Sequence, residues 1–176
     1  MQPRFAVDRM LGRLARWLRI LGFDAAYRPE MPGARLLTLA AREGRIVLTR
    51  DARLRDPRGR VRIVRLAADR FRDQLRELDR IFPLGGVEQR PSRCVECNVE
   101  VEALPLERVP QTVPEYVRAT QKEFQRCPRC RRIYWPATHR ERMQAEIAAL
   151  GLSEPEHDPE SARAHAHAPA AGEANG

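Results

Sequence analysis

Hydrophobic and polar residues follow two different periods along the chain, and the changes of period mark out strands and helices. A short apolar run occupies 4–8, and leucines then recur every three or four positions through 9–22, which is the spacing of an amphipathic helix. The arginines Arg9, Arg13 and Arg16 fall together on another face of that helix. We therefore expect a strand over 4–8, followed by a helix over 9–22 that buries its leucine face.

The alternation of strand and helix continues to residue 82. We predict further strands at 24–28, 45–51 and 61–66, and helices at 34–44 and 69–82. Such alternation is typical of a mainly parallel sheet that is flanked by helices. The expected fold class is therefore α/β, with this sheet in residues 1–82.

The composition changes after residue 82 and divides the rest of the chain into three segments. A hinge rich in Pro and Gly is expected at 83–92. A cysteine-containing module follows over 93–152 and closes with a helix at 139–151. The final segment, 153–176, is rich in Ala, Pro, Glu and His with little apolar material, so we expect it to be disordered.

Two Cys-x-x-Cys pairs contain all four cysteines of the chain. They are Cys94, Cys97, Cys127 and Cys130. Each pair forms a tight turn that directs two thiolates at one point, and two such turns complete the tetrahedral site of a structural zinc ion. Redox-active pairs or free buried thiols are the other interpretations, but a redox role does not explain two copies. We therefore predict a zinc ribbon, in which metal binding supplies much of the local folding energy.

Two aromatic residues follow the second cysteine pair. Tyr134 and Trp135 could stack on an unpaired nucleic-acid base. They could also pack against the ribbon or the neighbouring domain, and we favour this second interpretation.

Positive charge is concentrated in the first half of the chain. The formal net charge is +8, and residues 1–93 alone carry 22 arginines against 11 acidic residues. Such a field favours a polyanionic partner such as nucleic acid, although a coding bias towards arginine would give the same composition. No apolar run approaches the length of a membrane span, and the first residues lack the apolar region of a signal peptide. We therefore expect a cytoplasmic protein without a membrane partner.

Two aspartates follow expected strands on the same side of the sheet. Asp8 ends the first strand and Asp51 ends the third, and ligands of parallel α/β sheets bind at the carboxyl ends of the strands. Carboxylate oxygens suit Mg²⁺ or Mn²⁺, which can activate water and hold a phosphodiester. The two aspartates would equally serve as helix caps or turn formers. Arg13, Arg16 and Arg50 are candidates for phosphate contacts, although Arg50 could instead pair with a carboxylate.

Four separated blocks of the sequence resemble, in the same order, the Mut7-C RNase domain family. They are FAVDRMLGRLARWLRILGFD, EGRIVLTRD, RCVECN and CPRCRRIYWPATH, and together they span roughly residues 4–145. That family is described as a PIN-like nuclease fold with a C-terminal zinc ribbon and is predicted to cleave RNA. The resemblance implies metal-binding acids at Asp8 and Asp51, and zinc ligands at the four cysteines. The glycine that the family usually has after the second pair is Arg131 here.

One position departs from the pattern of the acidic site. PIN-like domains usually carry another acid at the start of the second helix, where this chain has Gly33. Glu30 is the nearest replacement, because Asp24 precedes a parallel strand and so lies at the opposite edge. The sequence thus predicts a ribonuclease with Asp8, Asp51 and Glu30 in its site, structural zinc, catalytic Mg²⁺ or Mn²⁺, and single-stranded or structured RNA as substrate. The alternative is a non-catalytic RNA-binding zinc-ribbon protein with a degenerate PIN-like site.

Overall fold

A computed structural model describes residues 2–85, 92–135 and 139–152 of the chain, with side chains from 145 onward in the last range. Most of the hinge expected at 83–92 therefore lies outside the described residues. The segment 153–176, which we expect to be disordered, lies outside them entirely.

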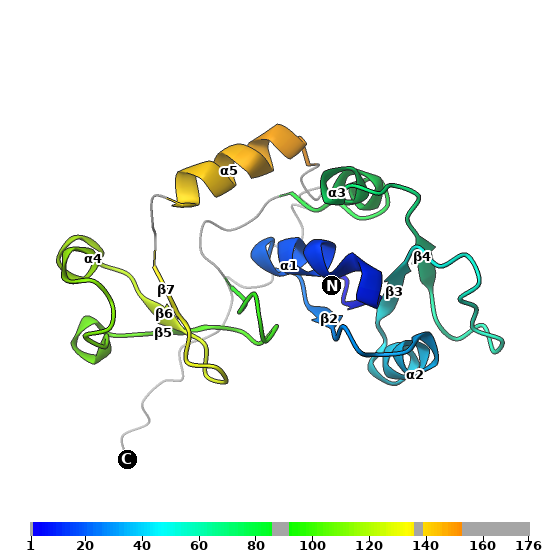
Figure 1. Ribbon diagram of the computed structural model, residues 1–176, viewed down its shortest axis with the longest axis horizontal. Helices are drawn as coiled ribbons and strands as arrows, with labels where there is room; N and C mark the ends of the chain where they lie inside the picture. Colours follow the sequence, from blue (N-terminus) through cyan, green and yellow to red (C-terminus); the bar gives the residue numbers. More distant parts are fainter. Residues whose placement is uncertain (1, 86–91, 136–138, 153–176) are drawn as a thin grey trace, which may run out of the picture.

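A four-stranded parallel sheet forms the centre of the larger part of the molecule (Figure 1). Its strand order is β2-β1-β3-β4, with bounds Ala25–Tyr27, Phe5–Val7, Ile46–Thr49 and Ile63–Arg65. All neighbouring strands pair in parallel, so their carboxyl ends lie along one edge of the sheet. The α/β fold class predicted from the sequence is confirmed.

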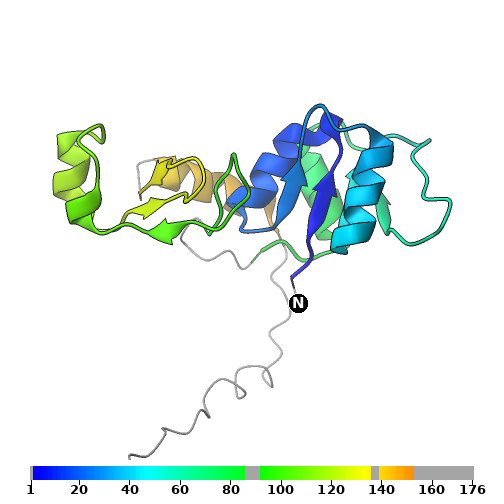
Figure 2. The same cartoon turned by 90° about the horizontal axis from the view of Figure 1, so that it is seen from below.

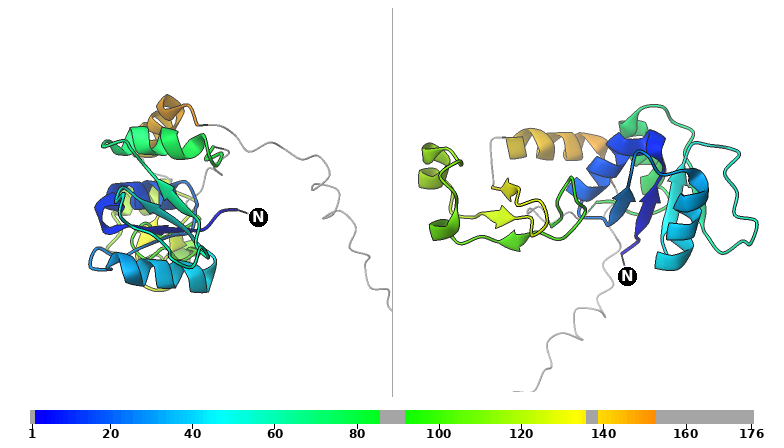
Figure 3. Two further views of the ribbon diagram at one scale, coloured as in Figure 1. Left: turned by 90° about the vertical axis from the view of Figure 1, so that its right-hand side faces the viewer. Right: turned by 60° about the horizontal axis from the view of Figure 1, so that its bottom comes forward.

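Helices cover both faces of this sheet (Figure 3). Helices α1 (Gly12–Ile20) and α3 (Phe71–Asp79) pack on the face that carries Phe5 and Leu48, and α2 (Gly33–Glu43) packs on the opposite face. Side chains of successive strand residues point to opposite faces, so the apolar strands supply both cores. None of the helices in the described part of the chain is long and apolar enough to cross a membrane.

The helix that the sequence predicts over 9–22 begins with a tighter turn. Arg9–Leu11 forms the 3₁₀ turn η1, and α1 starts only at Gly12. The carboxylate of Asp8 accepts a hydrogen bond from the backbone N–H of Arg9 at 2.7 Å, and the Asp8 carbonyl accepts one from the N–H of Leu11 at 2.9 Å. Asp8 therefore caps this turn directly after the end of β1.

The ribbon extends from one side of the sheet domain and makes the molecule elongated (Figure 2). Its antiparallel strands, in the order β5-β6-β7, are Glu102–Ala103, Gln125–Arg126 and Ile133–Tyr134. Between β5 and β6 the chain forms the 3₁₀ turn η2 (Leu106–Arg108) and helix α4 (Glu115–Thr120). A separate small core holds this insert together; it consists of Leu104, Val109, Val113, Val117 and Phe124.

Helix α5 (His139–Leu150) lies beside α3 (Figure 1). Glu146 of α5 forms an ion pair with Arg72 of α3 at 2.5 Å, and Leu150 is buried in the large core of the sheet domain. The sequence predicts this helix as the close of the cysteine module, whereas these side chains contact the sheet domain.

The first cysteine turn is attached to the edge strand β2. The guanidinium of Arg19, only 6% exposed, donates to the Ala25 carbonyl at 2.9 Å. It also donates to the carbonyls of Val95 at 2.8 Å and Glu96 at 2.9 Å. The side-chain oxygen of Asn98 accepts from the Ala25 N–H at 2.9 Å. The Arg19 and Asn98 side chains therefore hydrogen-bond to the carbonyl and the N–H of Ala25, on the outer side of the edge strand β2 where no other strand of the described residues pairs.

Asp24 reinforces this attachment from the amino edge of the sheet. Its carboxylate accepts hydrogen bonds from Arg45 and from the Asn98 amide, both at 2.6 Å. Partial burial works against the charged form, but these two hydrogen bonds outweigh it and hold the pKa of Asp24 below its usual value. Asp24 and Arg45 precede parallel strands, so they lie at the edge opposite the ends of β1 and β3.

Candidate metal centre and acidic edge

The four cysteine sulfurs lie together, where the first cysteine turn meets the β6-β7 hairpin. All four Sγ atoms are within 4.8 Å of one another, and those of Cys94 and Cys130 are 3.6 Å apart. A zinc ion bound by four thiolates at about 2.3 Å would set its sulfurs about 3.8 Å apart. None of the four cysteines is in a disulfide. They are therefore positioned to bind a metal ion.

The two Cys-x-x-Cys turns have the same backbone geometry. In each turn the N–H of the second cysteine donates to the sulfur of the first, at 3.3 Å and 3.4 Å. The N–H of the next residue donates to the carbonyl of the first cysteine, at 2.9 Å in both turns. That next residue is left-handed in both cases, with φ of 63° at Asn98 and 61° at Arg131. Asparagine tolerates this conformation and arginine is strained in it.

The phenol of Tyr134 belongs to the surroundings of this site. Its hydroxyl donates to the sulfur of Cys94 at 3.1 Å and accepts from the N–H of Val95 at 3.2 Å. Burial opposes the Cys94 thiolate, but hydrogen bonds from Tyr134 and from the backbone lower the pKa of Cys94, while burial and the neighbouring thiols raise the pKa of Cys97. Trp135 lies against Phe124, with ring centroids 6.5 Å apart. Both aromatic residues thus pack against the ribbon, which agrees with the second interpretation of the sequence.

At the carboxyl edge of the sheet, a threonine links the two predicted acids. Asp8 is 6% exposed, and its carboxylate accepts a hydrogen bond from the hydroxyl of Thr49 at 2.5 Å. The same hydroxyl accepts the backbone N–H of Asp51 at 3.0 Å. Thr49 is fully buried, so it fixes the spacing of these two residues. Thr49 is not among the residues predicted from the sequence, although its hydroxyl at the end of an apolar strand, two positions before Asp51, was the available signal.

Each aspartate also stabilises its own turn. Asp8 caps the 3₁₀ turn η1, and the carboxylate of Asp51 accepts the N–H of Arg53 at 2.8 Å. The Arg53 guanidinium lies 3.6 Å from the same carboxylate oxygen. The capping role that the sequence left open is therefore real for both residues. Both oxygens of the buried Asp8 carboxylate accept hydrogen bonds, from Arg9 and Thr49, whereas Asp51 is only partly buried.

The structure does not gather the predicted acids into a set of three. Within the described residues, the cysteines form the only group of three or more His, Cys, Asp or Glu residues whose ligand atoms come together. Glu30 is exposed in the turn after β2. Gly33 begins α2, and a Cβ atom built there would lie 2.7 Å from the Leu54 side chain, in the loop that follows Asp51. The start of α2 therefore faces that loop without supplying a carboxylate, and the three-acid site remains a prediction.

The three predicted phosphate-binding arginines are in different situations. Arg50 forms an ion pair with Asp69, which is the alternative that the sequence left open. The guanidinium of Arg13 lies 4.1 Å above the ring of Phe71. Arg16 is exposed on α1.

Fold and site together define an α/β protein with a parallel sheet and a four-cysteine metal centre. The Mut7-C RNAse domain family matches residues 3–147, and the chain belongs to this family. The match spans the sheet domain, the ribbon and most of α5, and it indicates a ribonuclease-like function with RNA as substrate or partner. Neither curated proteins nor solved structures give a significant match.

Proposed function

We propose that this chain is a metal-dependent ribonuclease of PIN-like fold that hydrolyses RNA phosphodiester bonds. The observation that carries the proposal is the link from Asp8 through Thr49 to Asp51, at the carboxyl edge of the sheet in a member of an RNase domain family. Ligand sites of parallel α/β proteins lie at this edge. We expect the enzyme to act in the cytoplasm, where thiols stay reduced and available to a metal.

The residues at this edge fit a hard divalent cation that keeps most of its water. Asp8 and Asp51 would hold Mg²⁺ or Mn²⁺ through carboxylate oxygens, with Glu30 as the nearest further acid. Bound there, the cation would supply Lewis-acid activation of water and of the phosphate. The protein positions the two metal-binding carboxylates through hydrogen bonds. The Thr49 hydroxyl orients the Asp8 carboxylate, and the backbone N–H of Arg53 orients the Asp51 carboxylate.

Cleavage of a labelled single-stranded RNA in Mn²⁺ or Mg²⁺ tests this proposal. We expect Asp51→Asn to abolish cleavage, and Glu107→Gln, which removes the same charge from the exposed turn η2, to leave it intact. Thr49→Val keeps the side-chain shape and removes the link, so metal affinity should fall roughly 10–100-fold, as for other residues that orient metal ligands. Cleavage that survives Asp51→Asn would refute the assignment of this site.

We further propose that the ion in the cysteine site is zinc with a structural role. Four protein thiolates leave no open coordination position, which is typical of structural rather than catalytic zinc. Metal analysis of freshly reduced protein should find about one zinc per chain, and Cys127→Ser should lose it. Reduced wild-type protein that contains no zinc would contradict this assignment.

A second candidate function is non-catalytic RNA binding. It is favoured by Gly33, which leaves the start of α2 without a carboxylate, because divalent affinity depends on the number of carboxylate ligands. RNA that is bound but never cleaved in either cation, with binding unaffected by Asp51→Asn, would support this function in place of the first.

A further inference from the structure

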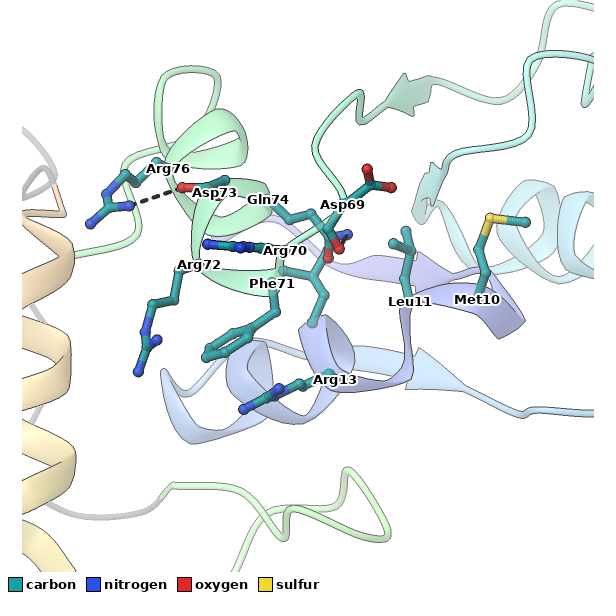
Figure 4. Close-up of a pocket in the computed structure, with 11 residues that line it drawn as sticks. Met10, Leu11, Arg13, Asp69, Arg70, Phe71, Arg72, Asp73, Gln74 and Arg76 are labelled. Atoms are coloured by element: carbon teal, nitrogen blue, oxygen red, sulfur yellow. Dashed lines mark hydrogen bonds and ion pairs between the residues drawn. The ribbon is translucent and has the colours of Figure 1, made fainter.

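A hollow lies between the start of α1 and the start of α3 (Figure 4). Its volume is about 590 Å³. The charged residues that line it are Arg13, Arg70, Arg72, Arg76, Asp69 and Asp73. Figure 4 shows the four arginine side chains on the side of the hollow nearer α5, with Asp69 and Met10 at the other end.

Two of these four arginines already have partners. Arg72 pairs with Glu146 of α5 at 2.5 Å. Arg76 pairs with Asp73 at 3.0 Å, which also neutralises that acid. The Arg72 pair therefore stabilises the packing of α3 on α5, and neither of these guanidinium groups adds much free positive charge.

The remaining positive charge of the hollow rests on two residues. Among the described residues, Arg13 and Arg70 have no carboxylate partner. The ring of Phe71 holds the Arg13 guanidinium in place without neutralising its charge. Arg70 is exposed at the cap of α3. The remaining acid, Asp69, is already paired with Arg50.

We propose that this hollow holds the sugar–phosphate backbone of single-stranded RNA, with Arg13 and Arg70 contacting phosphates. The inference rests on the proposed function and extends it to the substrate's path. The volume falls within the range of pockets that enclose small ligands, with room for roughly one or two nucleotides of a single strand and none for a duplex.

The ends of the hollow give this path a direction. At one end, Asp69 is paired with Arg50, the residue before Asp51, so a strand that leaves the hollow there reaches the acidic edge. At the other end, the ion pair of Arg72 with Glu146 holds α5 against α3, so that α5 closes this end of the hollow. The strand therefore runs from the acidic edge into the hollow and turns away from the protein at α5.

The salt dependence of RNA binding tests this path directly. A short fluorescein-labelled single-stranded RNA is titrated with full-length protein, without added Mg²⁺ or Mn²⁺, between 50 and 200 mM salt. Each phosphate contact to a single strand contributes about 0.7 to the slope of log K against log salt, so Arg13→Ala plus Arg70→Ala should lower the slope by about 1.4. Over this salt range the wild type should then lose about sevenfold more affinity than the double variant.

Charge-matched variants separate a defined path from a general positive field. Arg58→Ala plus Arg60→Ala removes the same charge from an exposed loop before β4, and this variant should keep the wild-type slope. Arg13→Lys plus Arg70→Lys keeps the charge and should keep the slope too, as expected if positive charge at these two positions sets the slope. Equal losses in the Arg58/Arg60 and Arg13/Arg70 variants would overturn the proposal.

The same variants distinguish failure of the path from failure of the proposed function. If the wild type cleaves RNA while Arg13→Ala plus Arg70→Ala binds with an unchanged slope, the path is wrong and the nuclease stands. If the slope falls as expected but no divalent cation supports cleavage by the wild type, the path stands on a protein that only binds RNA.

Discussion

Arg19 attaches the first cysteine turn to the sheet, and Arg19→Met tests how much that attachment contributes to stability. The wild-type guanidinium donates three hydrogen bonds to backbone carbonyls, two of them in the cysteine turn. Hydrogen bonds from a charged group contribute about 1.5–3 kcal/mol each. Part of this is offset, because burial of the guanidinium is itself unfavourable and lowers the pKa of Arg19 despite nearby acids. Methionine keeps much of the apolar stem, so we expect a net loss of about 3 kcal/mol.

Urea denaturation of the metal-loaded protein measures this loss, and two further measurements locate it. Zinc should pass to a competing chelator faster, and amide exchange should rise at residues 94–99, because the turn detaches from β2 before the sheet unfolds. Arg16→Met, one turn earlier on the same helix and exposed, is the matched control and should change stability by less than about 0.5 kcal/mol.

Two results would refute this reasoning. If the Arg19 and Arg16 variants unfold at the same urea concentration, the three hydrogen bonds make no net contribution. If Arg19→Met is destabilised but zinc release and amide exchange at 94–99 are unchanged, Arg19 supports the α1 helix and the sheet without holding the cysteine turn.

Three further predictions concern single positions. Arg131→Gly relieves the left-handed φ of 61°, so it should raise the urea midpoint by an amount equivalent to about 1 kcal/mol; a lower midpoint would show that the arginine side chain contributes more than the strain costs. Gly33→Asp adds the missing carboxylate and displaces only the flexible tip of Leu54, so Mn²⁺ titration should show tighter binding and Mn²⁺-supported cleavage should be faster; unchanged affinity would mean that a third acid is not limiting. Asp24→Asn should cost about 2 kcal/mol at neutral pH. The folded pKa of Asp24 lies below its unfolded value, so the stability that the Asp24 carboxylate contributes is present above the unfolded pKa and is lost as pH falls through the folded pKa. The difference between the urea midpoints of wild type and Asp24→Asn should therefore shrink below about pH 4. A difference that grows on acidification would contradict the assignment.

The sheet domain was predictable because its signals are local. The leucines of α1 follow the helical period, and the buried strands are short apolar runs, so element type and order can be derived from neighbouring residues alone. The element boundaries differ from the prediction at Asp8, which caps a 3₁₀ turn where the sequence predicts the first turn of an α-helix.

Contacts between distant residues were not predictable in this way. In the sequence, Arg19 resembles the surface arginines of α1. It is buried because it donates a hydrogen bond to the carbonyl of Val95, which lies 76 residues further along the chain. The strands β5, β6 and β7 have two residues each, too few to show a period, so their pairing depends on the ribbon as a whole. Thr49 was missed because its importance lies in joining two strands, which no single strand shows.

The cysteine centre takes its two turns from different parts of the molecule. The turn at 94–97 is fixed to the sheet through Arg19 and Asn98, and the turn at 127–130 belongs to the β6-β7 hairpin. A protease that cuts the insert at 104–124 would therefore leave two fragments that a bound zinc ion still holds together. The packing of α5 on the sheet domain, with Leu150 in its core, would also hold these fragments, so chelation would weaken the association of nicked protein without abolishing it.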